Sequence, residues 1–117
     1  MPVKNRLAEL HPEITEWRRD IHQHPEILFD TQRTSALVAE KLRSFGVDEV
    51  VTGIGRTGVV AVIKGKTTAS GKTIGLRADM DALPIEEQTG LEYASKTPGA
   101  MHACGHDGHT ACTKVAH

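Results

Sequence analysis

Residues 49–64 decide the fold class, and they read Glu49-Val50-Val51-Thr52-Gly53-Ile54-Gly55-Arg56-Thr57-Gly58-Val59-Val60-Ala61-Val62-Ile63-Lys64. Two runs rich in β-branched residues, 49–52 and 59–64, flank a glycine-rich stretch, 53–58. Runs of this kind around a short glycine-rich connection are typical of two strands joined as a hairpin. The stretch therefore predicts β-structure in the middle of the chain.

Both segments before the hairpin have a helical period instead. Over residues 4–23 the apolar positions recur every three or four residues, which predicts one amphipathic helix: Leu7, Leu10, Ile14, Trp17 and Ile21. Pro12 either kinks this helix or opens a second one, and Pro25 ends it. Residues 31–45 predict another helix, capped by Asp30 or Thr31.

After the hairpin, the pattern predicts one more strand and one more helix. Residues 73–78 read as a third, central strand that ends at Asp79-Met80-Asp81. The stretch 82–103 is mostly irregular, and a helix begins at about Gly108. Helices followed by strands predict an α/β layer architecture, with the helices packed on a mixed sheet.

The glycines of the hairpin also match a nucleotide-binding pattern. Gly53-x-Gly55-x-x-Gly58 follows a strand and has an acidic residue, Asp79, about twenty positions later. That fingerprint requires a helix next, because the helix N-terminus binds the pyrophosphate. Residues 59–63 predict a strand, so we interpret the glycines as a turn.

Composition excludes several classes of protein. The 117 residues carry a formal net charge of -1 and no basic run, which argues against nucleic acid as a partner. No stretch approaches the ~18 apolar residues of a membrane span. The N-terminal residues lack the apolar core of a secretory signal. With two cysteines, a disulfide framework is not expected, and we expect a cytoplasmic protein.

The densest group of chemically active side chains is His102-Ala103-Cys104-Gly105-His106-Asp107-Gly108-His109. A thiolate and an imidazole, at Cys104 and His106, suit zinc and also manganese, cobalt or nickel. Structural zinc usually takes four protein ligands in repeated pairs, and no second pair occurs here, so an open or incomplete site is favoured. Alternatively, Cys104 is a small buried residue and His106 a helix cap. We expect His109 and Cys112 to be helix residues, near the site and in the core respectively.

Acidic and imidazole side chains elsewhere offer weaker signals. Asp79 and Asp81 follow a predicted strand, where α/β proteins gather functional groups, so one of them could bind metal or orient a histidine ligand. They could equally be turn-forming aspartates. His22, His24 and Glu26 could also bind metal, but their place at a helix end favours a structural or substrate-rim role.

Four motifs in this order resemble a known family: Trp17-Arg18-Arg19-Asp20-Ile21-His22-Gln23-His24-Pro25-Glu26, Gly55-Arg56-Thr57-Gly58-Val59-Val60, Gly75-Leu76-Arg77-Ala78-Asp79-Met80-Asp81-Ala82-Leu83-Pro84-Ile85 and Met101-His102-Ala103-Cys104-Gly105-His106-Asp107-Gly108-His109. The chain resembles the N-terminal part of metal-dependent amidohydrolases of the hippurate hydrolase, N-acyl-amino-acid amidohydrolase and auxin-conjugate hydrolase type. The resemblance implies that residues 1–117 are the N-terminal portion of a zinc-exopeptidase-like catalytic domain. It implies that the rest of that domain and a lid and dimerisation domain are absent.

The same resemblance implies the chemistry. Cys104 and His106 would be the first two ligands of a site for two divalent metal ions (Zn, Mn, Co or Ni), and Asp81 an acidic residue that orients it. The general base, a glutamate, and two further histidine ligands would lie outside this chain. The whole protein would be a homodimer that hydrolyses the amide bond of small N-acyl or N-aroyl amino acids. The isolated chain would then be inactive.

Two other functions are compatible with the residues. Cys104 could be the nucleophile of a cysteine hydrolase or thiol redox protein, with His106 or His109 as its base. Alternatively, the chain could be a non-catalytic fragment that acts only by binding. This last hypothesis predicts exposed apolar surface and uncovered strand edges.

Overall fold

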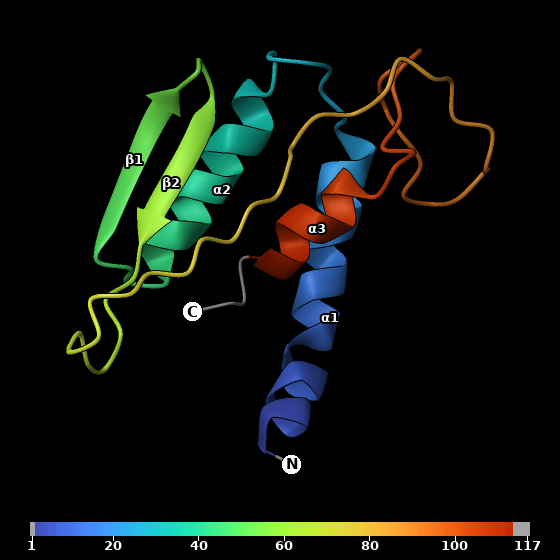
Figure 1. Cartoon of the computed structure of the whole chain (residues 1–117). Helices are drawn as coiled ribbons and strands as arrows, with labels where there is room; N and C mark the ends of the chain where they lie inside the picture. Colours follow the sequence, from blue (N-terminus) through green and yellow to red (C-terminus); the bar gives the residue numbers. More distant parts are fainter. Residues whose placement is uncertain (1, 114–117) are drawn as a thin grey trace.

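The computed structural model describes residues 2–113 (Figure 1). Its helices and strands are α1 (Pro2–Gln23), α2 (Gln32–Ser44), β1 (Glu49–Ile54), β2 (Gly58–Val62) and α3 (His106–Thr113). The α/β class is confirmed. The last residues of the chain, 114–117, lie outside the described residues. None of the described helices combines the length and apolar character needed to cross a membrane.

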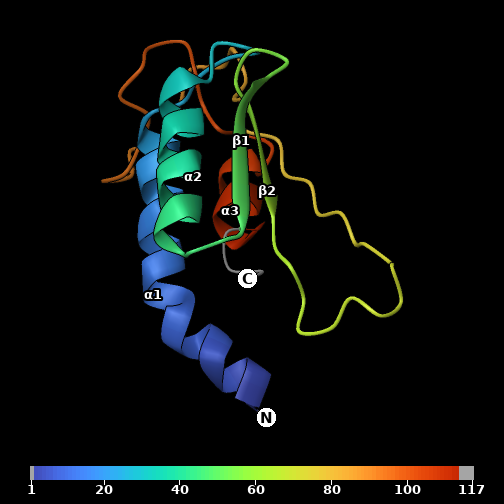
Figure 2. The same cartoon turned by 90° about the vertical axis from the view of Figure 1, so that its left-hand side faces the viewer.

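Helix α1 is one continuous helix, so the alternative in which Pro12 opens a second helix is wrong. Pro12 lies inside α1, and Figure 2 shows the N-terminal part of the helix inclined to the rest. The apolar stripe buries Trp17 and Ile21, whose exposed fractions are 7% and 0%. The helix ends at Gln23, two residues before Pro25, as predicted.

The start of α2 is capped differently from the prediction. Thr31 occupies the N-cap position but makes no capping hydrogen bond with its side chain, and its hydroxyl lies 2.6 Å from that of Thr57. The carboxylate of Glu26 caps the helix instead, accepting from the backbone N–H of Arg33 (3.0 Å) and of Thr34 (2.7 Å). Thr31 is therefore used to attach the hairpin loop, and Glu26 satisfies the free N–H groups of α2.

Strands β1 and β2 form the predicted antiparallel hairpin. Glu49 pairs with Val62 and Val51 with Val60, and the register is irregular between Val51 and Ile54. The glycine pattern lies in and around the turn, and β2, a strand, follows it, as predicted. The hairpin packs on α2, where the Ser35 hydroxyl donates to the Thr57 carbonyl at 2.6 Å.

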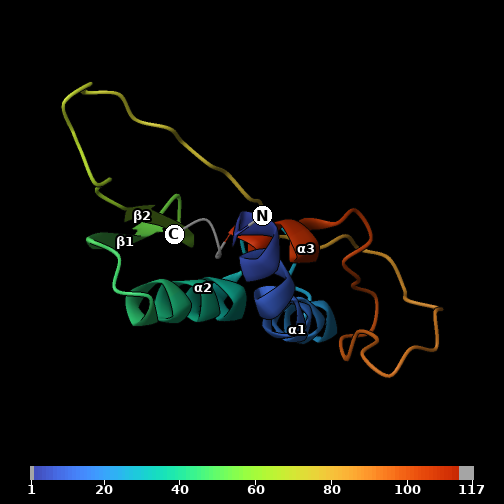
Figure 3. The ribbon, with the colours of Figure 1, turned by 90° about the horizontal axis from the view of Figure 1, so that it is seen from below.

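The predicted third strand does not form, and this part of the prediction is wrong. Residues 73–78 run as extended chain without a strand partner among the described residues, so the sheet there consists of β1 and β2 alone. Ile74 and Leu76 are 89% and 65% exposed. A strand requires a neighbour that supplies hydrogen bonds. Figure 3 shows the chain after β2 running out away from the helices and then returning alone towards α1 and α3.

The irregular stretch after Asp81 follows the end of α1. The Ala82 N–H donates to the Glu26 carbonyl at 2.7 Å, and Leu83 pairs with Met101. Lys96 N–H donates to the Gln23 carbonyl at 2.9 Å. These contacts bring the chain back so that α3 packs on α1, while α2 carries the hairpin (Figures 1 and 3).

Much apolar surface remains uncovered. The radius of gyration is 15.5 Å, larger than the about 13 Å of a compact domain of this size. Large apolar side chains on the hairpin and beyond it are at least two-fifths exposed, among them Ile54, Val60, Val62, Ile63 and Leu91. Uncovered surface of this kind is what the fragment hypothesis predicts.

Candidate metal centre

The predicted ligands lie on the short loop that leads into α3. Cys104 is exposed and its thiol is free. Gly105 has a φ of +97°, a conformation that favours glycine, and its carbonyl accepts from the His109 N–H at 3.0 Å. This bend places Cys104 just before the helix and His106 at its first residue.

The ring of His106 is held at one nitrogen. Nδ1 lies 2.8 Å from the Asp81 carbonyl oxygen and 3.1 Å from its carboxylate. A carbonyl only accepts, so Nδ1–H is the donor, and Nε2 is the ring nitrogen left for another partner. The His106 side chain is 23% exposed. A second-sphere oxygen at one ring nitrogen is the usual support of a histidine that binds metal through the other.

The strand-end aspartates approach the same helix. Asp81 contacts the His106 ring with both its backbone carbonyl and its side-chain carboxylate. The Asp79 carbonyl accepts from the Thr110 hydroxyl at 2.9 Å, and one Asp79 carboxylate oxygen lies 4.0 Å from His106 Nε2. The residues after position 78 thus form one wall of the site, although the strand itself is missing.

Two expectations for α3 have different outcomes. His109 is an exposed residue of the helix, with its ring centroid 6.3 Å from that of His106, as expected for a neighbour of the site. Cys112, expected in the core, is exposed. Thr110 and Ala111 are buried instead, because the face of α3 that carries them packs towards α1 and Asp79.

Among residues 2–113 no group of three or more histidine, cysteine or acidic side chains is arranged to hold a metal ion. The pair Cys104 and His106 fits one side of such a site by its chemistry, since a thiol and an imidazole are both ligands for zinc and related ions. A complete coordination sphere would require further ligands.

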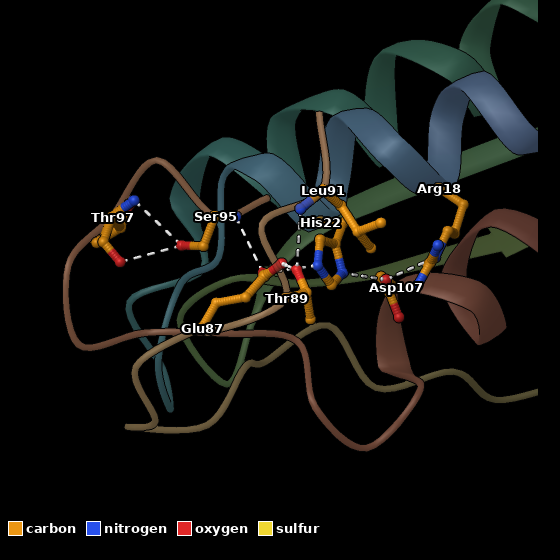
Figure 4. Close-up of polar contacts among 8 residues, drawn as sticks. All are labelled: Arg18, His22, Glu87, Thr89, Leu91, Ser95, Thr97 and Asp107. Carbon is orange, nitrogen blue, oxygen red and sulfur yellow. Dashed lines mark hydrogen bonds and ion pairs between the residues drawn. The ribbon is translucent and has the colours of Figure 1, made fainter. Parts of the chain in front are cut away.

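Next to the ligand loop lies a buried network of polar side chains that the sequence did not predict (Figure 4). His22 Nδ1 lies 2.8 Å from Asp107 Oδ2, and His22 Nε2 lies 2.8 Å from Glu87 Oε1. Arg18 Nε donates to the same Asp107 oxygen at 2.8 Å. Arg18 and His22 stand four residues apart on one face of α1, a spacing that could have signalled a shared partner. No feature of the sequence pointed to a role for Glu87.

Both carboxylates of this network are held ionised. Burial would raise the pKa of Asp107, but the His22 hydrogen bond, the Arg18 charge and the Gly108 N–H outweigh it, and the pKa is lowered. Burial likewise opposes ionisation of Glu87, but hydrogen bonds from Thr89, from the Ser95 N–H and from His22 lower its pKa. The network is therefore ionic rather than neutral.

His102 behaves differently from His22. It is 3% exposed, and neither ring nitrogen has a hydrogen-bond partner among the described residues. Burial is the main cause that lowers the pKa of His102, and the charges of His22 and His106 act in the same direction, while Asp107 and Asp81 oppose them. His102 is thus a buried neutral imidazole.

The helix-end residues have the structural role favoured for them. Glu26 caps α2, and His24 Nδ1 donates to the Asp20 carbonyl at 2.8 Å. His22 is buried in the network instead of lining a substrate rim.

Comparison with known proteins agrees with this geometry. The family model described as peptidase family M20/M25/M40 matches residues 75–115, the segment that holds Asp79, Asp81, Cys104 and His106. A solved Bacillus subtilis structure, described as a dinuclear metal-binding peptidase of the M20 family, superposes with a TM-score of 0.83 at 44% identity, covering 92% of this chain and 29% of that one. The chain belongs to this family.

Three curated relatives of the chain have the names of hydrolases. It is 53% identical to thermostable carboxypeptidase 1 of Saccharolobus solfataricus over 93% of its length. It is 52% identical to the hippurate hydrolase of Campylobacter jejuni over 94%, and 46% identical to the N-acyl-L-amino acid amidohydrolase of Geobacillus stearothermophilus over 93%. The chain spans only 27%, 28% and 29% of these three proteins. By family it is a hydrolase, and its fold is part of an M20 catalytic domain.

Proposed function

We propose that this chain is the N-terminal portion, residues 1–117, of the catalytic domain of an amidohydrolase that cleaves N-acyl amino acids. Cys104 and His106 supply the first ligands of its two-metal site, and Asp81 orients His106. The observation behind this assignment is the His106 ring: its Nδ1 donates to the Asp81 carbonyl, so Nε2 is the nitrogen available to a metal ion. The exposed thiol of Cys104 lies on the same loop.

Divalent metals, when bound, lower the pKa of a water molecule and polarise the scissile carbonyl of an amide. The residues of this chain hold the two ligand side chains, Cys104 and His106, in a fixed orientation. Asp81 holds the His106 ring, and Gly105 bends the loop between the two ligands. The general base and the remaining ligands would come from the part of the whole protein that corresponds to the rest of the relatives, of which this chain spans 27%, 28% and 29%.

Substrate class follows the names of the relatives. The hippurate hydrolase and the N-acyl-L-amino acid amidohydrolase, at 52% and 46% identity, support a small N-acyl amino acid as substrate. We further propose that the whole protein is a homodimer and acts in the cytoplasm, where both cysteines would stay free thiols. The metal is one of zinc, manganese, cobalt or nickel.

Cobalt spectroscopy tests the ligand assignment, and the chain contains its own control. Co²⁺ added to the chain should produce a thiolate-to-cobalt absorption that is lost in Cys104→Ser and His106→Ala. It should persist in Cys112→Ser, since Cys112 is the other exposed free thiol. An absorption that depends on Cys112, or that survives loss of Cys104, would refute the assignment.

The 117-residue chain alone should hydrolyse hippurate at no more than the background rate, because residues 2–113 hold no complete group of metal ligands. Robust turnover that resists chelators and stops on thiol alkylation would instead indicate a cysteine nucleophile. No hydrogen bond joins Cys104 to a histidine in the described part of the chain, which weighs against that alternative.

A further inference from the structure

His22 stands between two buried carboxylates that come from distant parts of the chain. Its side chain is 3% exposed, and those of Asp107 and Glu87 are 2% and 3% exposed. Asp107 belongs to α3, and Glu87 to the irregular stretch before it, as Figure 4 shows. His22 is thus the one side chain in Figure 4 that touches both acids across their separation in sequence.

The two contacts hold the ring of His22. His22 Nδ1 lies 2.8 Å from Asp107 Oδ2 and His22 Nε2 lies 2.8 Å from Glu87 Oε1, so the position of the ring is fixed at both nitrogens. Arg18 donates to the same Asp107 oxygen at 2.8 Å, so Arg18, His22 and the two acids form one connected set. Such a connected and fully hydrogen-bonded set can remain buried, whereas an isolated charge could not.

Asp107 connects this set to the candidate ligands. It follows His106 directly, and its Oδ1 accepts from the Gly108 N–H at 2.9 Å while its Oδ2 accepts from Arg18 and His22. The first turn of α3 is therefore fixed to α1 through a side chain adjacent to His106. The Asp81 carbonyl holds His106 from the opposite wall.

We propose that His22 is a positioning residue for the candidate metal centre: by holding Asp107 and Glu87 together, it sets the direction in which His106 and Cys104 are presented to a metal ion. This inference rests on the proposed function. It adds a residue of α1, far from the ligand loop in sequence, to the support of that loop. His22 does not touch the metal, the substrate or the reacting atoms.

The first test compares Co²⁺ binding in His22→Gln and in a matched control, Thr34→Val. Gln retains bulk but cannot donate in both directions. Thr34→Val removes a hydrogen bond of another buried side chain, from its hydroxyl to Glu26, away from the ligand loop. Both variants are first confirmed to be folded by circular dichroism. His22→Gln should weaken Co²⁺ binding about 10-fold or more, as loss of an outer support does, and Thr34→Val should leave it unchanged. Equal affinities for all three proteins, or equal losses in both variants, would overturn the proposal.

A second readout needs no metal. In ¹⁵N NMR spectra, the His106 ring of the unmodified chain should be a single Nδ1–H tautomer, and His22→Gln should shift it towards a mixture. An unchanged His106 spectrum overturns the positioning role even if Co²⁺ binds. Absent Co²⁺ binding together with a changed His106 spectrum would contradict the proposed function but support the coupling. If His22→Gln does not fold, Glu87→Gln serves instead; it should shift the His106 spectrum less, and no shift at all would contradict the proposal.

Discussion

Two histidines of equal burial should respond in opposite ways to the same substitution. His22 and His102 are both 3% exposed, and their ring centroids are 6.4 Å apart. His22 hydrogen-bonds to two buried carboxylates, whereas His102 has no partner among the described residues. The substitution to leucine therefore separates the effect of hydrogen bonding from that of burial.

The expected difference is large. His22→Leu leaves the buried carboxylates of Asp107 and Glu87 without their shared hydrogen-bond partner, and removing one partner from a buried charged group costs about 3–5 kcal/mol of unfolding free energy. His102→Leu removes an imidazole whose burial without hydrogen bonds itself costs about 1–3 kcal/mol, so stability should be unchanged or increased. The two variants should thus differ by about 3 kcal/mol or more.

Urea unfolding followed by the fluorescence of Trp17, the single tryptophan, measures this difference. Trp17 is 7% exposed on α1, the helix that carries His22, so it reports on the relevant packing. If both variants lost the same free energy, or if His102→Leu lost more, the reasoning from hydrogen-bond partners would be refuted.

Three further predictions concern acid stability, capping and the hairpin. The folded-state pKa of Glu87 is lowered, so the stability that its carboxylate contributes is complete above the ordinary pKa of 4.5 and is lost as the pH falls through the folded pKa. In urea unfolding at several pH values, Glu87→Gln should therefore be less stable than the unmodified chain at neutral pH and approach it in acid. A difference in unfolding free energy that stays constant down to the lowest pH would contradict this. Glu26→Ala should lower the unfolding free energy by about 0.5–2 kcal/mol, as loss of a helix cap does. Thermal unfolding followed by circular dichroism measures this, and an unchanged melting temperature would show that Glu26 does not stabilise α2. Gly58→Ala would place a Cβ 2.5 Å from the Ile54 carbonyl oxygen, so it should lower the melting temperature, whereas Gly75→Ala meets nothing within 4 Å and should not; equal effects would show that the clash is absent.

The features that could be predicted from the sequence are those that depend on local physics. The period of apolar residues defined α1, and the glycine-rich turn between β-branched runs defined the hairpin. These features depend on neighbouring residues alone, and so they could be predicted.

The features that could not be predicted from the sequence are those whose contacting residue lies in a distant part of the chain or is absent from its described residues. Residues 73–78 have a strand pattern, but a strand forms only beside another strand, and none of the described residues provides one. Helix caps are usually adjacent to the helix, which predicts Asp30 or Thr31 for α2, but Glu26 accepts from the N–H groups of Arg33 and Thr34 instead. Cys112 has the character of a core residue, but its face of α3 is not the one turned to α1.

The sequence by itself determined the chemistry available at the candidate centre: the thiol of Cys104 and the imidazole of His106, separated by the single residue Gly105. The resemblance had already named Asp81, but the tertiary structure alone decided that its carbonyl contacts His106 and that His22 contacts Asp107. Asp81 lies twenty-five residues before His106, and His22 lies eighty-five residues before Asp107. Contacts over such separations depend on how α1, α3 and the loops pack, and no local pattern encodes that packing.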